Sequence, residues 1–499
     1  MKKNLDLLLV TPPSKDQVFQ KLGENLTGIE PPVWSTLMAT FVRNSGFSTH
    51  ILDAEAECIG FDETAKRILD IDAVLTVFVI YGHQPSASTQ CMPAGRAVCD
   101  RVVAANAELK TLVMGTHASS LPERTLSEEP YTYVCQGEGP DTVLNLLQAL
   151  KAGSDRLDKI PGLWYRKDGK IFNNPTAENI VDLDGRLPGQ AWDLLDMTKY
   201  RAHNWHCFDH IHARQPYASL QTSLGCPYKC SFCCINAPFG QAGIRYWSPK
   251  TIVDQIDILV NRYGVKNIKI PDEMFVLNEQ HVLGICDLII ERGYDLNIWA
   301  YARVDTVKDR YLEKLKRAGF NWLALGIESG SKYVRDGVEK GRFGDVDIVK
   351  TTDKIKEHGI YIIANYIFGL PDDTHESMQE TLDLSIEINA EWANFYCAMA
   401  YPGSPLYERA VQSGWQLPDG PGGPGWIGYS QHAYEALPLR TDSLAYTEVL
   451  DFRDKAFDHY FTHPKFLEMI NRRFSQELVD HIHDMVRVKI KRKHRSVSL

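Results

Sequence analysis

The sequence has no apolar run long enough to cross a membrane, no compositional sign of disorder and no excess of basic residues. Its 499 residues carry 54 Lys and Arg against 64 Asp and Glu, which gives a formal net charge of -10. This acidic balance argues against general binding to nucleic acid backbones, which requires basic surfaces. A hydrophobic fraction of 44% with 24% charged residues is typical of a globular protein long enough for two or three cores.

The first residues imitate a secretion signal without completing it. Two lysines precede the apolar residues 7–10, but Asp6 interrupts the pattern and Thr11-Pro12-Pro13 ends it. A signal peptide needs a longer apolar core, so we expect no export. The cysteines are spaced for metal binding and not for disulfides, which favours a reducing, low-oxygen cytoplasm.

One segment, residues 487–495, is strongly basic against this background. Such a run is usually a solvated terminal face. Contact of this segment with a membrane surface or another polyanion is the alternative that the sequence leaves open.

Four cysteines are clustered: Cys226, Cys230, Cys233 and Cys234. The first three follow the spacing CxxxCxxC, in which three thiolates can hold a [4Fe-4S] cluster and leave one iron open for chemistry. Zinc sites pair CxxC motifs or combine them with histidines, and no second CxxC pair follows here. Cys234 falls outside the spacing, and we interpret it as a packed thiol. A zinc-stabilised binding protein without catalytic activity remains an alternative.

Phe232 stands directly before the third cysteine and completes the pattern CxxxCxΦC. In this the chain resembles the radical S-adenosylmethionine (radical SAM) superfamily. The resemblance implies that the open iron chelates the amino acid end of S-adenosylmethionine, and that one electron then cleaves this cofactor to a 5'-deoxyadenosyl radical. The electron would come from a low-potential donor such as flavodoxin or ferredoxin.

The first 150 residues alternate short apolar runs with amphipathic helical patterns. Leu37, Met38 and Phe41 repeat at helical spacing between Pro31-Pro32 and Gly46. Five strands joined by helices predict a doubly wound parallel sheet, which gathers ligands beyond the carboxyl ends of its strands. The expected strands lie at residues 5–10, 48–54, 73–82, 110–115 and 131–139.

Residues suited to a large ligand follow these strands, and glycines among them permit close approach of the backbone. They are Pro12, Gly82, His83, Gln84, Ser86, Gly115, Thr116, His117, Ser119, Gly137, Glu138 and Gly139. Their order resembles the cobalamin-binding (B12-binding) domain that precedes many radical SAM enzymes, whose Gly-x-His-x-Ser and Gly-Glu-Gly loops border the corrin and its nucleotide tail. The resemblance implies cobalamin as a further cofactor. His83 and His117 could each equally be loop histidines bonded to backbone.

The chain departs from the methionine synthase type of cobalamin domain at one position. That type supplies a histidine to cobalt from Asp-x-His-x-x-Gly, whereas Glu55 stands at the histidine position after Asp53 here. We therefore expect no protein imidazole on the lower face of the cobalt, although His83 or Gln84 could lie near it.

From residue 216 to residue 400 a strand, loop and helix pattern repeats about six times and predicts a partial TIM barrel, (β/α)6. Ser248-Pro249 begins one helix and Gly264 ends it. Such barrels place their chemistry at the carboxyl ends of the strands, and the cysteine loop follows the first strand. The expected strands lie at residues 219–224, 267–270, 297–302, 322–327, 361–368 and 394–399.

Polar residues at the other strand ends suit the ammonium, carboxylate and ribose of S-adenosylmethionine. The family resemblance implies that Asp272 and Glu273 accept from the amino group and that Arg303 pairs with the carboxylate. It also implies that Glu328 contacts the ribose or the methionyl end. The residues that would border the adenine are Phe232, Asn365 and Gly369. Each polar residue alone could instead be a helix cap or a surface ion pair.

The remaining segments frame these two domains. Residues 151–215 read as a linker, whose histidines and Trp205 could line a substrate cavity or could simply pack. Residues 401–499 read as a mainly helical region that caps the open side of the barrel. His432 and Tyr434 are candidates for substrate contacts.

The resemblance implies a cobalamin-dependent radical SAM enzyme, most often a methyltransferase. In such enzymes methylcobalamin passes its methyl group to an unactivated carbon made reactive by the 5'-deoxyadenosyl radical. A cyclase or rearrangement enzyme with the same cofactors but no methyl product is the alternative. The sequence does not identify the small-molecule substrate.

Overall fold

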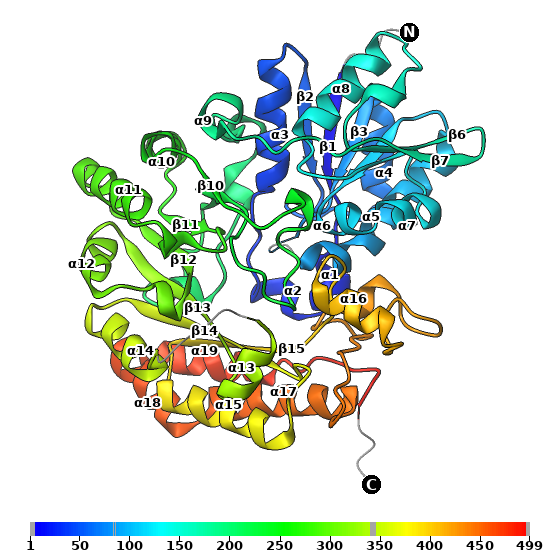
Figure 1. Ribbon diagram of the computed structural model, residues 1–499. Coiled ribbons are helices and arrows are strands. Elements are labelled where there is room, and N and C mark those ends of the chain that lie inside the picture. The colour runs from blue at the N-terminus through cyan, green and yellow to red at the C-terminus, as the bar shows by residue number, and fades with distance from the viewer. Residues whose placement is uncertain (1–4, 83, 85, 340–345, 496–499) are drawn as a thin grey trace.

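Two parallel β-sheets organise the chain, and a helical region covers the side of the second sheet (Figure 1). This computed structural model describes residues 5–82, 84, 86–339 and 346–495. The predicted α/β class, with a doubly wound sheet before a partial barrel, is confirmed.

The first sheet has the strand order β2-β1-β3-β4-β5-β6-β7, and its first five strands are parallel. Four lie within the predicted ranges and β1 extends one residue beyond its range of 5–10: β1 Leu7–Thr11, β2 Thr49–Asp53, β3 Leu75–Val79, β4 Thr111–Met114 and β5 Tyr133–Cys135. Their near-continuous apolar residues are buried on both faces, as a parallel sheet between helix layers requires. The helices of this part are α1 Lys15–Phe19, α2 Leu22–Asn25, α3 Val33–Asn44, α4 Phe61–Ile71, α5 Ala87–Ala105, α6 Thr116–Ser120, α7 Pro122–Glu128 and α8 Pro140–Lys151.

The segment expected to be a linker adds a hairpin to this sheet. β6 (Leu163–Lys167) pairs antiparallel with β5, and β7 (Lys170–Asn173) pairs antiparallel with β6. Asp168 and Gly169 between them both have positive φ, 50° and 72°. An Asp-Gly turn of this kind is a strong local hairpin signal, which the sequence interpretation overlooked.

The second sheet has six parallel strands in the order β15-β14-β13-β12-β11-β8, the predicted partial barrel. Its strands are β8 Tyr217–Ser219, β11 Asn267–Ile270, β12 Asn297–Arg303, β13 Phe320–Glu328, β14 Tyr361–Phe368 and β15 Trp392–Cys397. The covering helices are α10 Pro249–Tyr263, α11 Glu279–Arg292, α12 Asp309–Arg317, α13 Lys332–Gly337, α14 Ile348–Glu357 and α15 His375–Ile388. Ser248 caps α10 by accepting from the Thr251 N–H, and Gly264 ends it with φ 65°, as predicted.

The first barrel strand differs from its predicted range of 219–224. β8 ends at Ser219, and β9 (Ser223–Leu224) instead pairs antiparallel with β10 (Arg245–Tyr246). No proline or glycine interrupts residues 219–224, so no local turn signal marks the break. The consequence is a short two-stranded ribbon at the base of the cysteine loop.

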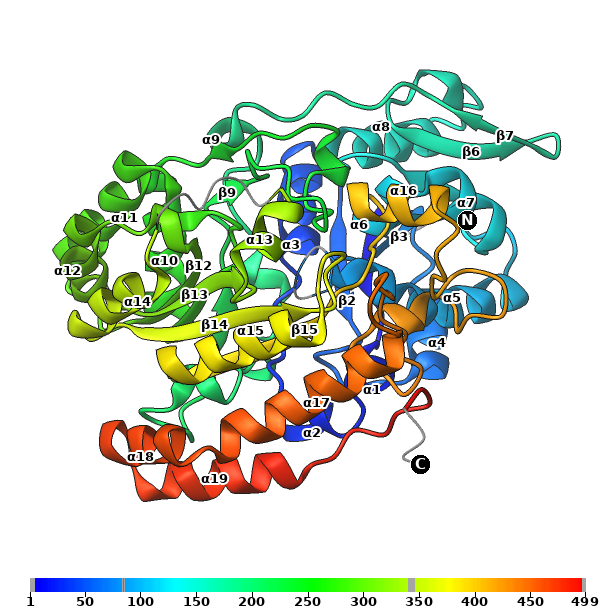
Figure 2. The ribbon, with the colours of Figure 1, turned by 60° about the horizontal axis from the view of Figure 1, so that its bottom comes forward.

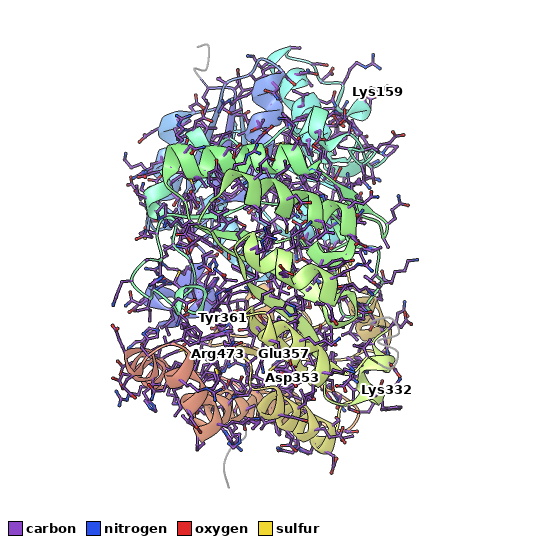
Figure 3. The ribbon with its side chains drawn as sticks, turned by 90° about the vertical axis from the view of Figure 1, so that its left-hand side faces the viewer. Lys159, Lys332, Asp353, Glu357, Tyr361 and Arg473 are labelled. Carbon is purple, nitrogen blue, oxygen red and sulfur yellow. The ribbon has the colours of Figure 1, made fainter. Side chains whose placement is uncertain are left out.

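The linker and the C-terminal region both pack at the amino-terminal end of the barrel strands. Trp205 packs edge-on against Trp299 and Trp322, with ring centroids 5.2 and 5.6 Å apart, at the amino-terminal end of the strands. Arg473 of α18 lies 5.3 Å over the ring of Tyr361 at the start of β14 (Figure 3). The remaining helices are α9 Leu183–Arg186, α16 Pro405–Gln412, α17 Tyr446–Thr462, α18 Pro464–Arg473 and α19 Gln476–Arg487.

The C-terminal region also reaches the first sheet. Figure 2 shows α16 beside α6 and α7, away from α17 to α19. Arg124 of α7 forms an ion pair of 2.5 Å with Asp419 and lies 4.5 Å over the Trp426 ring. Of the helices in the described ranges, none combines the length and the apolar character that a membrane span requires.

Candidate active site

The cysteine loop connects β9 to β10. Its base is closed by the Gly243 N–H, which donates to the Cys226 carbonyl at 3.0 Å. Gly225 has φ 88°, and a Cβ there would stand 2.5 Å from the Gly243 carbonyl oxygen, so only glycine fits. The Asn236 side chain donates to the Tyr228 carbonyl at 3.1 Å. The backbone therefore holds the loop in shape.

Cys226, Cys230, Cys233 and Cys234 all line one cavity of about 250 Å³. Burial raises the pKa of the Cys226 thiol to about 12 and that of the Cys233 thiol well above its usual value. Buried thiolates therefore need compensating positive charge, which bound iron would supply.

The thiols lie around the cavity and do not meet at one point. In the part of the chain that the structure describes, no three His, Cys, Asp or Glu side chains converge as ligands of a single metal ion. An iron-sulfur cluster spreads its thiolate ligands over several irons, whereas zinc gathers four ligands around one ion. The preference for a cluster over zinc therefore rests on the CxxxCxxC spacing.

Arg303 ends β12 and lines the same cavity. Its guanidinium bonds both oxygens of Asp305, at 2.9 and 3.0 Å, and lies 4.0 Å over the Tyr228 ring in the cysteine loop. Burial would disfavour its charge, but Asp305 holds the Arg303 pKa above its usual value. A fixed cation therefore stands beside the thiols.

Glu328 reaches the cavity because the end of β13 is irregular. Its φ is 67°, a left-handed conformation uncommon for a side chain of this size, and the pairing with β14 shifts between Gly326 and Glu328. Bulges of this kind re-aim side chains and are frequent beside active sites. Phe232 and Asn365 line the same cavity, as predicted for the adenine side.

Two residues predicted to contact S-adenosylmethionine have other surroundings. Asp272 is fully buried and accepts from the Thr222 N–H and from the hydroxyls of Thr222 and Ser223, at 2.5 to 2.7 Å. Gly369 faces α17, where an added Cβ would meet Val449 at 2.6 Å. The lining of the two cavities includes neither, and Asp272 instead supports the strand that leads into the cysteine loop.

A larger cavity of about 360 Å³ lies between the first sheet and the barrel interior. Thr11 at the end of β1, Pro12 after it, and Tyr81 and Gly82 after β3 line it. In the strand order β2-β1-β3, the chain after β1 goes to β2 on one side and then to β3 on the other side of β1. Doubly wound sheets bind their ligands at such a switch point, here between β1 and β3. Thr116 lines this cavity, Ser86 lines the cysteine cavity and Gln84 lines both.

The other predicted cobalamin contacts lie behind this edge. The Ser119 hydroxyl and the Gly137 backbone bond each other. Glu138 accepts from the Ile180 N–H at 2.8 Å and pairs with Arg245 beside the cysteine loop. Gly139 packs against Met114, at 2.5 Å from an added Cβ. Of these contacts, the Glu138–Arg245 pair joins the sheet edge to the strand beside the cysteine loop.

The two predicted histidines of this domain have different outcomes. His117 is buried, its Nδ1 lies 3.3 Å from the Thr89 hydroxyl, and its ring contacts Trp426 at 4.4 Å. Burial lowers its pKa to about 3, so the ring is neutral. Gly115 before it has no room for a side chain, because a Cβ would stand 2.0 Å from the Ile80 carbonyl oxygen. His83 lies outside the described residues.

Glu55 lines the larger cavity but its carboxylate is engaged. One oxygen accepts from the backbone N–H groups of Ser14 and Lys15, at 2.8 and 3.1 Å. The carboxylate therefore holds the start of α1.

The two candidates for substrate contacts in the C-terminal region have different surroundings. His432 lines the larger cavity, whereas Tyr434 is 46% exposed and lines neither cavity. The basic segment is partly paired: Arg492 is buried against Asp454 at 2.9 Å, and Lys489 bonds Asp458 at 2.7 Å.

Several residues of the larger cavity were missed from the sequence. The rings of Trp34 and Tyr81 stack at 4.8 Å, 12° from parallel, below the sheet edge. Glu30, His203 and Lys269 form a charged group at the barrel floor. Trp205 lines the cavity and also packs, so both readings of the linker apply. No local pattern indicated Lys269, because a single lysine in a short strand is ordinary until Glu30 is brought beside it.

Comparison with known proteins gives two family matches. Residues 220–385 match the radical SAM superfamily and residues 20–147 match the B12 binding domain. An uncharacterized methyltransferase of Pyrococcus horikoshii is 31% identical over 82% of this chain and 84% of its own length. An anaerobic magnesium-protoporphyrin IX monomethyl ester cyclase of Rubrivivax gelatinosus is 25% identical over 78% of this chain and 67% of its own length.

Two solved structures share the fold at low identity. The radical S-adenosylmethionine methyltransferase TsrM of Kitasatospora setae, with tryptophan substrate and a SAM analogue bound, has a TM-score of 0.67 and 16% identity. The alignment covers 97% of this chain and 98% of that chain. The cobalamin-dependent S-adenosylmethionine radical enzyme OxsB, with aqua-cobalamin bound, has a TM-score of 0.69 and 15% identity. It covers 97% of this chain and 71% of that one.

Proposed function

Because the chain belongs to the cobalamin-dependent radical SAM enzymes, we propose that it is a C-methyltransferase acting on an unactivated carbon of a small molecule. The family resemblance and the enzyme class predicted from the cysteine motif are confirmed by these matches. Methyl transfer itself is supported by the Pyrococcus relative, which is a methyltransferase by name and aligns over most of both chains.

The observation that carries the proposal is the continuity of the two cavities. They share eight lining residues: Gln84, Ile235, Glu273, Tyr301, Asn365, Tyr396, Tyr401 and Gln431. A substrate carbon at this junction could be approached from the cysteine side and from the edge of the first sheet. Holding reactants in one place is the main contribution of a protein whose cofactors carry the chemistry.

The side chains fit the cofactor set of [4Fe-4S] cluster, S-adenosylmethionine and cobalamin. When bound, these groups would supply a carbon-centred radical and a transferable methyl group. Cys226, Cys230 and Cys233 would hold the cluster, while Glu273, Arg303 and Glu328 would orient the charged end of S-adenosylmethionine. The sheet edge at β1 and β3, with Trp34 and Tyr81, would take the corrin.

Glu273 is suited to receive an ammonium group. It lines both cavities, and burial raises its pKa to about 7, so a neighbouring cation would stabilise its charged form. Tyr301, Tyr396 and Tyr401 also line this junction, and burial raises the pKa of each phenol, so their hydroxyls are neutral groups beside Glu273.

The second candidate function is a cyclase or rearrangement enzyme, favoured by the similarity to the Rubrivivax cyclase. Anaerobic turnover of candidate substrates with methyl-labelled S-adenosylmethionine separates the two. Methyl transfer requires S-adenosylhomocysteine, 5'-deoxyadenosine and a labelled product one methylene heavier. 5'-Deoxyadenosine without S-adenosylhomocysteine and without label in the product would favour the second function.

The same preparation tests the metal. Anaerobic reconstitution should give a brown protein with close to four irons per chain. Stoichiometric zinc without iron would support the zinc-stabilised binding protein instead. The expected electron donor is a flavodoxin or ferredoxin, and the cluster would need the reducing conditions of the cytoplasm.

A further inference from the structure

A buried ion pair lies at the floor of the larger cavity, inside the barrel. The Lys269 ammonium of β11 lies 2.8 Å from the Glu30 carboxylate, which the first domain contributes from the segment before α3. The two side chains are only 2% and 7% exposed, and both line the cavity. The pair therefore joins the two domains in the interior, where barrels ordinarily place Val, Ile and Leu.

His203 is the third residue of this cluster, and its contacts indicate which ring nitrogen carries the proton. Its Nδ1 accepts from the Gly28 N–H at 3.1 Å, so the ring proton is on Nε2, which faces Glu30 at 3.4 Å. Burial lowers the His203 pKa, which keeps the ring neutral. One carboxylate oxygen of Glu30 therefore faces His203 and the other faces Lys269.

Stability alone does not account for such a group. Buried ion pairs lose much of their attraction to desolvation, and apolar residues of similar volume often stabilise a fold as well or better. An apolar side chain of similar length at position 269 would face the same cavity and the Trp299 ring, so packing does not require a lysine there. Charged groups kept in a cavity indicate a polar ligand.

The walls above the pair are aromatic. Trp299 lies 5.1 Å from the Lys269 ammonium, Trp205 meets Trp299 edge-on at 5.2 Å, and Trp392 lines the same space. Flat indole walls accept an apolar, preferably planar, body.

The distance from Lys269 to the junction of the two cavities can be judged from the course of the chain from β11 onward. Lys269 in β11 and Pro271 and Glu273 after its end all line the cavity, and Glu273 stands at the junction with the cysteine cavity. Residues four apart in the chain can be separated by up to roughly 13 Å. A ligand held at Lys269 would therefore present a remote carbon, not one next to its charged group, at the junction.

The hydrogen-bond partners within the Lys269–Glu30 pair indicate whether the ligand group should be negative or positive. An ammonium carries three donors and can bridge two carboxylates, whereas a cationic ligand would have to compete with Lys269 and His203 for Glu30. Resting on the methyl-transfer function proposed above, we propose that Lys269, held by Glu30, anchors the carboxylate of an elongated substrate with an apolar body, which is methylated far from that carboxylate.

The test uses three matched probes on the reconstituted holoenzyme: 4-phenylbutanoate, 4-phenylbutan-1-ol and 4-phenylbutylammonium. We expect calorimetry to show the carboxylate binding about tenfold more tightly than the alcohol, and the ammonium binding most weakly. Equal binding of the three, including no measurable binding by any, or preference for the ammonium overturns the proposal.

Variants locate the effect. Lys269→Met should abolish the carboxylate preference, Lys269→Arg should keep part of it, and Lys266→Met should leave it intact. Lys266 is the matched control, since it is 68% exposed and pairs with Asp295 just before β11. A carboxylate preference that survives Lys269→Met overturns the proposal. If the preference holds but no candidate substrate gains a methyl group, the methyl-transfer function fails and the anchor stands.

Discussion

Asp272 and Glu273 are consecutive, yet their carboxyl groups face opposite sides of the strand end. Asp272 accepts from Thr222 and Ser223 behind the cysteine loop, while Glu273 lines both cavities. The turn that begins at Glu273, after the end of β11, separates the two side chains. Two carboxylates that look equivalent in sequence therefore have different tasks.

The first prediction separates these tasks. Asp272→Asn removes an acceptor for two hydroxyls and should weaken retention of the cluster about tenfold, as loss of outer partners of metal ligands does. Glu273→Gln should keep iron at the wild-type level and weaken S-adenosylmethionine binding about tenfold. Iron per chain and the change in the electron paramagnetic resonance spectrum on adding S-adenosylmethionine report the two effects. Equal iron loss in both variants would contradict this assignment.

The second prediction concerns the cysteines. Cys226→Ala should abolish iron binding after anaerobic reconstitution, because a ligand is lost. Cys234→Ala is the matched control: this thiol lines the same cavity but stands outside the spacing, and iron should remain within about twofold of wild type. Iron analysis and visible absorption measure both. Normal iron content in Cys226→Ala would refute the ligand assignment.

A third prediction concerns Gly115 at the end of β4. Gly115→Ala places a methyl group 2.0 Å from the Ile80 carbonyl oxygen at φ 149°, and we expect a loss of about 3 kcal/mol or more. Gly46→Ala is the control, because its φ is 86° but nothing lies within 4 Å, and it should cost about 1 kcal/mol. Thermal unfolding compares them. Equal losses would mean that backbone conformation alone, and not the contact, decides.

The fourth prediction is a pH dependence at the C-terminal segment. Arg492 and Arg453 lower the pKa of Asp454 to about 2 although burial opposes this. Since the folded pKa lies below the ordinary value of 3.8, the contribution is complete above pH 4 and is lost as the pH falls toward 2. Asp454→Asn should therefore cost about 2 kcal/mol at pH 6 and progressively less in acid.

Urea unfolding from pH 6 to pH 3 measures this difference. The exposed Asp442→Asn serves as the control and should show no difference that depends on pH in this way. A constant gap between wild type and Asp454→Asn across the range would argue that packing, and not charge, explains the loss.

Local patterns allowed much of the fold to be predicted. The five parallel strands of the first sheet and the six-strand barrel follow from apolar runs and from the spacing of Gly and Pro signals. α10 begins and ends where Ser248 and Gly264 indicate. The break between β8 and β9 was not predictable in this way, because Asp272, fifty residues away, supplies the hydrogen bonds that hold the second piece.

Some residues of the candidate site could likewise be predicted from local patterns, and others could not. The cysteine spacing, Arg303 and the glycine loops are readable because they are local in the chain. Gly369 and Tyr434 have the right residue types but face α17 and solvent. Lys269 went unnoticed because one lysine in a strand carries no signal until Glu30 and Trp299 are brought beside it.

The sequence by itself determined the two-sheet architecture, the cysteine motif and the family, because these depend on spacings of a few residues that backbone geometry converts directly into structure. Only the tertiary structure decided which carboxylates reach the cavities, how the two cavities join, and that a charged pair lies beneath indole walls. Those features depend on side chains that are distant in the chain and meet only when both sheets pack, so no local pattern could record them.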